Sequence, residues 1–252
     1  MKYSFVDNER MEAFKGGKGI CILCKKETIA KCGTRIVHHW AHKTIFECDS
    51  WWENETEWHR EWKSKFPKEW QEVVHFDEET GEKHIADIKT DKGLVIELQN
   101  SPISIEELNS REAFYKKLIW IVNGQAFIKN FYILHKLPNP KADFVQDIAF
   151  MDRKKDHLGK LFYRYSENDE NATMVELHSI KEIQNEINAN FIGHHLYDWV
   201  RPRSVWQESG CRVFIDFGNE YLWELQEYDK RGLKCVKRYD KEYFIKRANR
   251  NN

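Results

Sequence analysis

The sequence of 252 residues predicts an α/β protein built in three parts. Residues 51–128 switch between helix-like and strand-like spacing of apolar residues, which is typical of helices layered on a sheet. Residues 1–50 hold four of the six cysteines and too few aliphatic residues for a core of their own, so we expect a small zinc-finger-like module. Residues 129–252 contain strand-like and helix-like segments without a chemical motif, and we expect an α+β extension of unknown role.

The composition is that of an ordinary water-exposed protein, with 41% hydrophobic and 32% charged residues and a net charge of −1. An apolar run of about 18 residues is missing, so we expect no membrane span. The first residues lack the apolar core of a secretory signal, so a cytoplasmic location is expected. Residues 1–45 carry nine Lys or Arg against four Asp or Glu, a local excess that suits either phosphate contact or a solvated surface.

The elements expected within residues 51–128 follow from local spacing. A helix is predicted over residues 53–66, because Trp58, Trp62 and Phe66 recur at every fourth position. A second helix after residue 101 is expected to start at the N-cap Ser104. Strands are predicted near residues 72–76, 84–90, 93–99 and 118–124, the first two joined by a hairpin turn.

Two polar residues interrupt the apolar strand over residues 93–99. Side chains alternate along a strand, so Glu97 and Gln99 share one face. A turn over residues 89–93 would place Asp87 beside Glu97, and two close carboxylates repel each other unless a cation lies between them. Mg²⁺ is held by one or two carboxylates with several waters, and Gln99 would orient a water or a phosphate. Alternatively, Asp87 and Glu97 lie on the surface of an edge strand and Gln99 is a polar neighbour with its hydrogen bonds satisfied, so the spacing alone leaves both interpretations open.

A second candidate metal site lies in residues 1–50. Cys21 and Cys24 form a C-x-x-C motif, and His39 and His42 follow after a gap typical of zinc sites. These four residues would give one structural zinc ion a closed set of ligands. A surface loop with ordinary thiols is the alternative. The other residues able to bind zinc nearby are His38, Cys32 and Cys48.

The motif HIAD, the segment IELQNSPIS and the strand end IVNG together resemble the CoiA-like competence proteins, which are assigned to the PD-(D/E)XK nuclease superfamily. This resemblance implies a restriction-endonuclease-like core over residues 51–128. It implies Asp87 and Glu97 as ligands of Mg²⁺ (or Mn²⁺), with Gln99 at the position where a lysine is usual. The similarity of the motif His-Trp-Ala-His to the family's H-F-A-H favours His39 over His38.

The resemblance also covers the first helix and the second. Glu57, His59 and Lys63 match an E-x-H-x-x-x-K pattern, which implies that Glu57 or His59 contacts metal-bound water or phosphate. Lys63, Arg111 and Tyr115 become candidate contacts to nucleic acid, although Tyr115 suits a core position equally well.

The function expected from these residues is a Mg²⁺-dependent deoxyribonuclease in DNA processing, recombination or defence against foreign DNA. Its partner is DNA, together with a protein of the same system or a second copy of the chain. The alternative is a non-catalytic nucleic-acid-binding or assembly module on the same fold. Gln99 favours this alternative, because an amide is not a proton acceptor at neutral pH.

Overall fold

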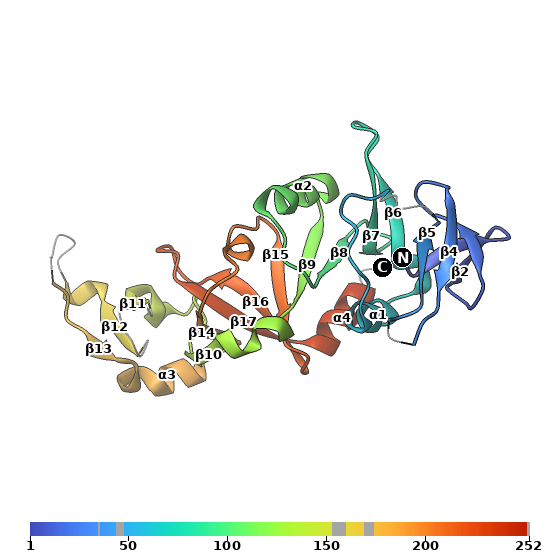
Figure 1. The fold of residues 1–252 in the computed structure, drawn as a ribbon. Coiled ribbons are helices and arrows are strands. Elements are labelled where there is room, and N and C mark those ends of the chain that lie inside the picture. The colour runs from blue at the N-terminus through green and yellow to red at the C-terminus, as the bar shows by residue number, and fades with distance from the viewer. Residues whose placement is uncertain (35, 44–47, 153–159, 169–173, 251–252) are drawn as a thin grey trace. The chain divides into compact units, whose positions relative to one another are not determined.

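The computed structural model describes residues 1–252 except 35, 44–47, 153–159, 169–173 and 251–252. The chain forms two compact units (Figure 1). The first consists of Met1–Asn123, Glu208–Arg212 and Phe244–Asn252, and the second of Gly124–Gln207 and Val213–Tyr243. The first unit therefore contains both the expected zinc module and the expected core, together with two segments from the far end of the sequence.

The N-terminal part of the first unit is a five-stranded antiparallel sheet with the order β2-β1-β3-β4-β5. Its own core is small: Met1, Cys21, Leu23 and Trp40 form one buried cluster. Two of the partly buried residues packed against this cluster, Val74 and Ile85, come from outside the module. The strands are β1 (Tyr3–Val6), β2 (Glu9–Glu12), β3 (Lys18–Ile20), β4 (Glu27–Lys31) and β5 (His39–His42).

The remainder of the first unit has the predicted alternation of helices and strands. In sequence it runs α1 (Glu57–Ser64), β6 (Gln71–Phe76), β7 (Lys83–Lys89), β8 (Val95–Gln99), α2 (Ile105–Tyr115) and β9 (Leu118–Asn123). Strands β6, β7 and β8 are antiparallel neighbours, whereas β9 lies parallel to β8. The helix α2 makes the crossover that a parallel pair needs. Thr56 caps α1 and Ser104 caps α2, the latter as predicted.

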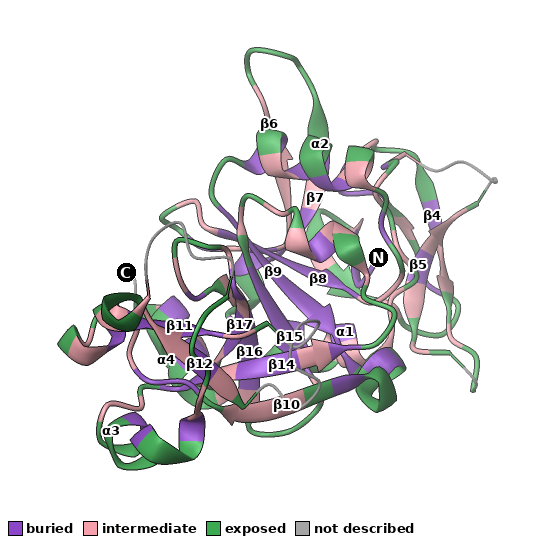
Figure 2. Cartoon of the chain, turned by 90° about the vertical axis from the view of Figure 1, so that its left-hand side faces the viewer, coloured by how far each residue is buried: buried purple, intermediate pink, exposed green. Residues whose placement is uncertain are grey.

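Strand β8 lies in the interior of the first unit. All residues of β8 and β9 are buried, and both strands are purple along their length in Figure 2. Glu97 and Gln99 are each only 4% exposed. The alternative that Glu97 lies on the surface of an edge strand is therefore wrong, whereas Gln99 has hydrogen-bond partners in Glu53 and Ser101.

Two distant segments complete the first unit. Helix α4 (Lys241–Arg250) contributes Phe244, whose ring lies 6.5 Å from that of Trp62 on α1. The Asn249 side chain donates a hydrogen bond to the carbonyl of Lys65. In the segment 208–212, Ser209 and the backbone of Gly210 bind the carboxylate of Glu112 on α2. The end of the chain is therefore not confined to a separate extension.

The second unit is of the α+β kind that was expected after residue 128. Its strands β10, β14, β17, β16 and β15 pair antiparallel, and a separate sheet has the order β11-β12-β13. The bounds are β10 (Phe131–Lys136), β11 (Ile148–Phe150), β12 (Leu161–Arg164), β13 (His178–Ser179), α3 (Gln184–Ala189), β14 (His194–Trp199), β15 (Arg212–Asp216), β16 (Tyr221–Glu227) and β17 (Lys234–Asp240). The molecule is thus a mixed α/β protein with large sheets and few helices.

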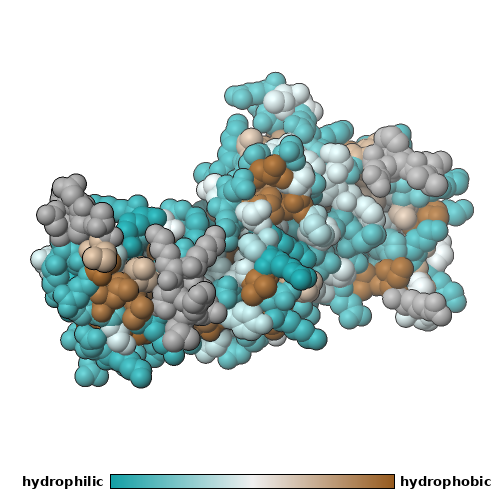
Figure 3. Space-filling view, turned by 60° about the vertical axis from the view of Figure 1, so that its left-hand side comes forward, coloured by the Kyte–Doolittle hydropathy of each residue, from teal (hydrophilic) through white to brown (hydrophobic). Residues whose placement is uncertain are grey.

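In the described part of the chain, none of the helices has the length and apolar character needed to cross a membrane. On the face drawn in Figure 3, the described apolar residues form small separate groups among hydrophilic ones.

Candidate metal cluster and acidic pocket

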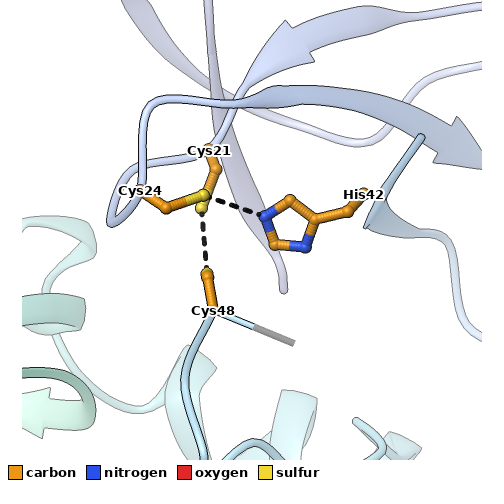
Figure 4. A group of neighbouring side chains, drawn as sticks. All are labelled: Cys21, Cys24, His42 and Cys48. Atoms are coloured by element: carbon orange, nitrogen blue, oxygen red, sulfur yellow. Dashed lines mark hydrogen bonds between the residues drawn. The ribbon is translucent and has the colours of Figure 1, made fainter. Parts of the chain in front are cut away.

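Three cysteines and one histidine converge in the first unit (Figure 4). Cys21 and Cys24 lie in the turn between β3 and β4, His42 ends β5, and Cys48 precedes the segment that leads to α1. The Sγ atoms of Cys21 and Cys48 are 3.7 Å apart, and Sγ of Cys24 is 3.2 Å from Nε2 of His42. All four donor atoms lie within 4.8 Å of one another.

This donor set suits zinc. With Zn–S distances of about 2.3 Å and Zn–N distances of about 2.0 Å, the edges of a tetrahedral site are about 3.5–3.8 Å long. The cysteines are free thiols, and the hydrogen bond from Cys48 lowers the pKa of Cys21 to about 4, which favours the thiolate form that binds metals. The cluster can therefore hold a metal ion such as zinc, with the Cys₃His set of a closed structural site.

His39 is not part of this cluster, which corrects the expected ligand set. His39 and His42 both lie on β5, three residues apart, so the alternation of a strand turns them to opposite faces. Nδ1 of His39 is hydrogen-bonded to the carbonyl of Val37 at 2.9 Å. Cys48 takes the fourth place, and the other candidates, His38 and Cys32, lie outside the cluster.

A pocket of about 60 Å³ lies where β7 and β8 meet α1 and the segment before it. Ile88 pairs with Ile96 in the antiparallel register, so Asp87 stands opposite Glu97 as the hairpin predicted. The backbone N–H of Asp87 donates to Oε1 of Glu97 at 3.2 Å. Six carboxylates line this pocket, those of Asp49, Glu53, Glu55, Glu72, Asp87 and Glu97, with Lys63 and Arg111 as the lining cations of fixed charge.

Lys63 is the central cation of this acidic pocket. Its Nζ lies 2.9 Å from Asp87, 3.1 Å from Glu72 and 3.3 Å from Glu55. Burial lowers the pKa of Lys63, but the charges of these three carboxylates outweigh burial and raise the pKa well above its usual value. Lys63 therefore stays protonated and offsets part of the negative charge.

At Glu97 the nearby cation does not outweigh the effect of burial on the pKa. Burial and the neighbouring Asp87 raise the pKa of Glu97 to about 8, although Arg111 acts in the opposite direction. Nη1 of Arg111 lies 3.1 Å from Glu97, and its Nη2 donates to the carbonyl of Trp51 and pairs with Glu107. Arg111 thus holds Glu97 in place from α2 and lines the pocket itself.

Of the two predicted helix residues Glu57 and His59, only His59 lines the pocket. Glu57 is exposed and does not line the pocket. His59 is 3% exposed, and both ring nitrogens are engaged. Its Nδ1 accepts from the backbone N–H of Thr56, and its Nε2 donates to the carbonyl of Leu98 at 3.1 Å and to Glu53 at 3.2 Å. His59 therefore caps α1 and ties it to β8.

Gln99 and Tyr115 are not among the residues that line the pocket. The amide of Gln99 donates to Glu53 at 3.3 Å and to the carbonyl of Ser101 at 3.2 Å, so it fastens the chain after β8. Tyr115 is 3% exposed, and its ring packs against Phe114 and Trp51. It is a core residue.

The sequence reasoning missed four of the six carboxylates: Asp49, Glu53, Glu55 and Glu72. Three of them lie in an irregular segment before α1, where no periodicity marks a buried position. Glu72 has a φ of +46°, an unfavourable backbone conformation for a residue with a side chain. Its carboxylate accepts from the backbone N–H groups of Lys2 and Tyr3. The available signal was the density of acidic residues around the expected helix.

Among the described residues, the cysteine cluster is the one group of three or more His, Cys, Asp or Glu donors close enough to share a metal ion. Asp87 and Glu97 are a pair that already faces Lys63 and Arg111. Comparisons of the chain with protein-family models, curated proteins and solved structures find no match.

Proposed function

We propose that the first unit is a metal-dependent nuclease that hydrolyses phosphodiester bonds of DNA at the acidic pocket. The observation that carries this proposal is the pairing of Asp87 with Glu97 across β7 and β8, with the ammonium group of Lys63 2.9 Å from Asp87. Two carboxylates and a lysine around one small pocket are a constellation suited to phosphoryl chemistry. The resemblance to the CoiA-like family and its restriction-endonuclease-like core favours the same reaction.

Each residue has a distinct part in this proposal. Asp87 and Glu97 would hold Mg²⁺ or Mn²⁺, which when bound supplies a polarised phosphoryl oxygen and a bound water of lowered pKa. The excess of carboxylates over cations in the pocket is the feature that suits a divalent cation. Lys63 supplies the positive charge that the E-x-Q sequence lacks at Gln99, next to where charge develops on the phosphate. Arg111 fixes the orientation of Glu97.

The test is cleavage of end-labelled single-stranded and double-stranded DNA with Mg²⁺ or Mn²⁺. We expect cleavage by the wild type and a loss of at least about 100-fold for Asp87→Asn and for Glu97→Gln. Glu106→Gln is the matched control, because Glu106 is exposed on α2 and does not line the pocket. The proposal fails if the wild type cuts neither substrate with either ion, or if Asp87→Asn cuts as fast as the wild type.

One observation favours a second function, a nucleic-acid-binding module without catalysis. Asp87 and Glu97 are both paired with cations of the protein itself, so the pocket is already partly neutralised. A module of this kind would bind DNA equally well with EDTA and with Mg²⁺, and would leave it intact. Measuring DNA affinity under both conditions alongside cleavage separates the two functions.

A further inference from the structure

The cysteine cluster and the acidic pocket are joined by one short stretch of chain. Cys48 is a member of the cluster, and Asp49, the next residue, lines the pocket. Glu53 and Glu55 follow in the same stretch and line the pocket too. Residues 48–55, called the acidic strap below, thus run from one site into the other.

The acidic strap has no helix or strand of its own. Side chains fasten it to the sheet instead. Asp49 accepts from the backbone N–H of Ile85 at 2.9 Å and from Nδ1 of His84 at 2.7 Å. Glu53 accepts from the backbone N–H groups of Ser101 at 2.5 Å and Asn100 at 3.2 Å.

Charges act on the strap in both directions. Asp49 and Glu53 are paired with His84 and His59, and Glu55 is paired with Arg60 at 2.8 Å. Its three carboxylates lie around the same pocket as Glu72, Asp87 and Glu97, while Lys63 and Arg111 are the lining cations of fixed charge. Like charges in a buried site repel strongly. The strap is thus held by side-chain contacts without sheet pairing, and its first residue, Cys48, is the point at which a bound metal ion would add an anchor.

We propose that a zinc ion bound by Cys21, Cys24, His42 and Cys48 anchors the acidic strap and thereby builds the acidic pocket. The ion links the strap to the β3–β4 turn and to the end of β5, so the strap loses less conformational entropy when its carboxylates dock. Zinc is then required for the geometry of the pocket, which is the site of the proposed nuclease function. The effect of zinc on the pocket can be measured without a cleavage assay.

The experiment combines zinc content with amide hydrogen exchange of the full chain. The wild type is expected to hold one zinc ion per chain. Removing zinc with a chelator should speed exchange at Ile85, Asn100 and Ser101 by at least about tenfold, because these amides donate to Asp49 and Glu53. Exchange in β9 should stay slow and report that the core is folded. Adding zinc back should restore protection.

Two variants make the test specific. Cys48→Ser is expected to lose zinc and to show the same faster exchange, whereas Cys32→Ser keeps zinc and protection because Cys32 lies outside the cluster. Asp49→Asn should keep zinc, yet the backbone amide of Ile85 should exchange faster, because this amide donates to Asp49. If Cys48→Ser does not fold, the chelated and refilled wild type gives the answer.

Two results would overturn the proposal: a wild type that neither contains nor takes up zinc, and zinc removal that leaves exchange at these three amides unchanged. Zinc-dependent protection in a protein that cuts no DNA would support the anchor while rejecting the nuclease. If complete zinc removal changes neither cleavage nor exchange, the result would support the nuclease and reject the zinc anchor.

Discussion

The ammonium group of Lys63 lies 2.9 Å from the carboxylate of Asp87, and the two residues come from different elements, α1 and β7. The lysine side chain is 4% exposed and that of Asp87 21% exposed. This ion pair fixes α1 against the strand that carries the pocket, and it places a permanent positive charge beside the carboxylates. Lys63 is therefore the residue on which both stability and the proposed chemistry depend.

Lys63→Met should destabilise the protein by about 3–5 kcal/mol, because it removes the buried cation shared by Glu72, Glu55 and the partly exposed Asp87. Urea unfolding at pH 7 measures this loss. Lys65→Met is the control, since Lys65, the C-cap of α1, makes a more exposed pair with Glu61 and should matter little. Equal unfolding midpoints for the two variants would contradict the central role of Lys63.

Glu72 is expected to make the free energy of unfolding depend on pH in the acid range. Burial raises its pKa, but the charge of Lys63 and the backbone N–H groups of Lys2 and Tyr3 outweigh burial and lower the pKa to about 2, from an ordinary value of 4.5. Its contribution is thus fully present above pH 4.5 and is lost as the pH falls from 4.5 towards 2. Its size is on the order of 3 kcal/mol.

Glu72→Gln should therefore lower the free energy of unfolding at pH 7, and the difference from the wild type should shrink steadily below pH 4.5. Denaturant unfolding between pH 3 and pH 7 gives both numbers. Glu69→Gln, at an exposed site nearby, should show no such convergence. A difference for Glu72→Gln that stays constant over this range would show that the Glu72 pKa is not lowered.

The sequence predicts what depends on local spacing. The alternation of Leu94, Ile96 and Leu98 with polar residues identifies β8, and the short turn after β7 sets Asp87 opposite Glu97, because a hairpin fixes its register. Ser104 is found as the N-cap of α2, because capping needs only neighbouring residues. Each of these features depends only on residues that lie close together in the sequence.

The features that the sequence did not predict depend on contacts between distant residues. His39 was expected to bind zinc because the motif His-Trp-Ala-His resembles the H-F-A-H of the CoiA-like family, but β5 is a strand and turns His39 away from His42. Cys48 was one of three further candidate ligands in the sequence, and only the tertiary structure places it in the cluster. Asp49, at the start of the acidic strap, is buried because its carboxylate binds β7, which no periodic pattern encodes.

His59 is predicted to act on stability rather than on chemistry. His59→Ala removes the hydrogen bond to the carbonyl of Leu98 and the reciprocal cap at Thr56, so we expect a loss of about 1–3 kcal/mol in urea unfolding. Cleavage by the folded variant should stay within about tenfold of the wild type, whereas loss of a general acid or base costs about 10²–10⁴-fold. Glu57→Gln should leave both unchanged. A cleavage loss above about 100-fold in folded His59→Ala would make His59 catalytic.

Trp52 is predicted to contact the nucleic acid. Trp51 stacks on His84 at 3.4 Å, whereas the adjacent Trp52 is 43% exposed and lines the acidic pocket. An exposed ring at the pocket can stack on a base of a single strand, which contributes about 1–3 kcal/mol. Trp52→Ala should therefore raise the Kd for single-stranded DNA roughly 5- to 150-fold, while Trp52→Phe should retain most of the affinity.

Fluorescence anisotropy with a labelled oligonucleotide, in an Asp87→Asn background that prevents cleavage, measures this effect. Phe76→Ala is the matched control. Phe76 ends β6 and is 55% exposed, but it does not line the pocket. Stacking predicts a strong effect at Trp52 alone, and a weaker one on blunt duplex, whose bases are already stacked. The same Kd for Trp52→Ala and the wild type on single strands would remove Trp52 from the binding site and leave the pocket with its charged residues as the contact to DNA.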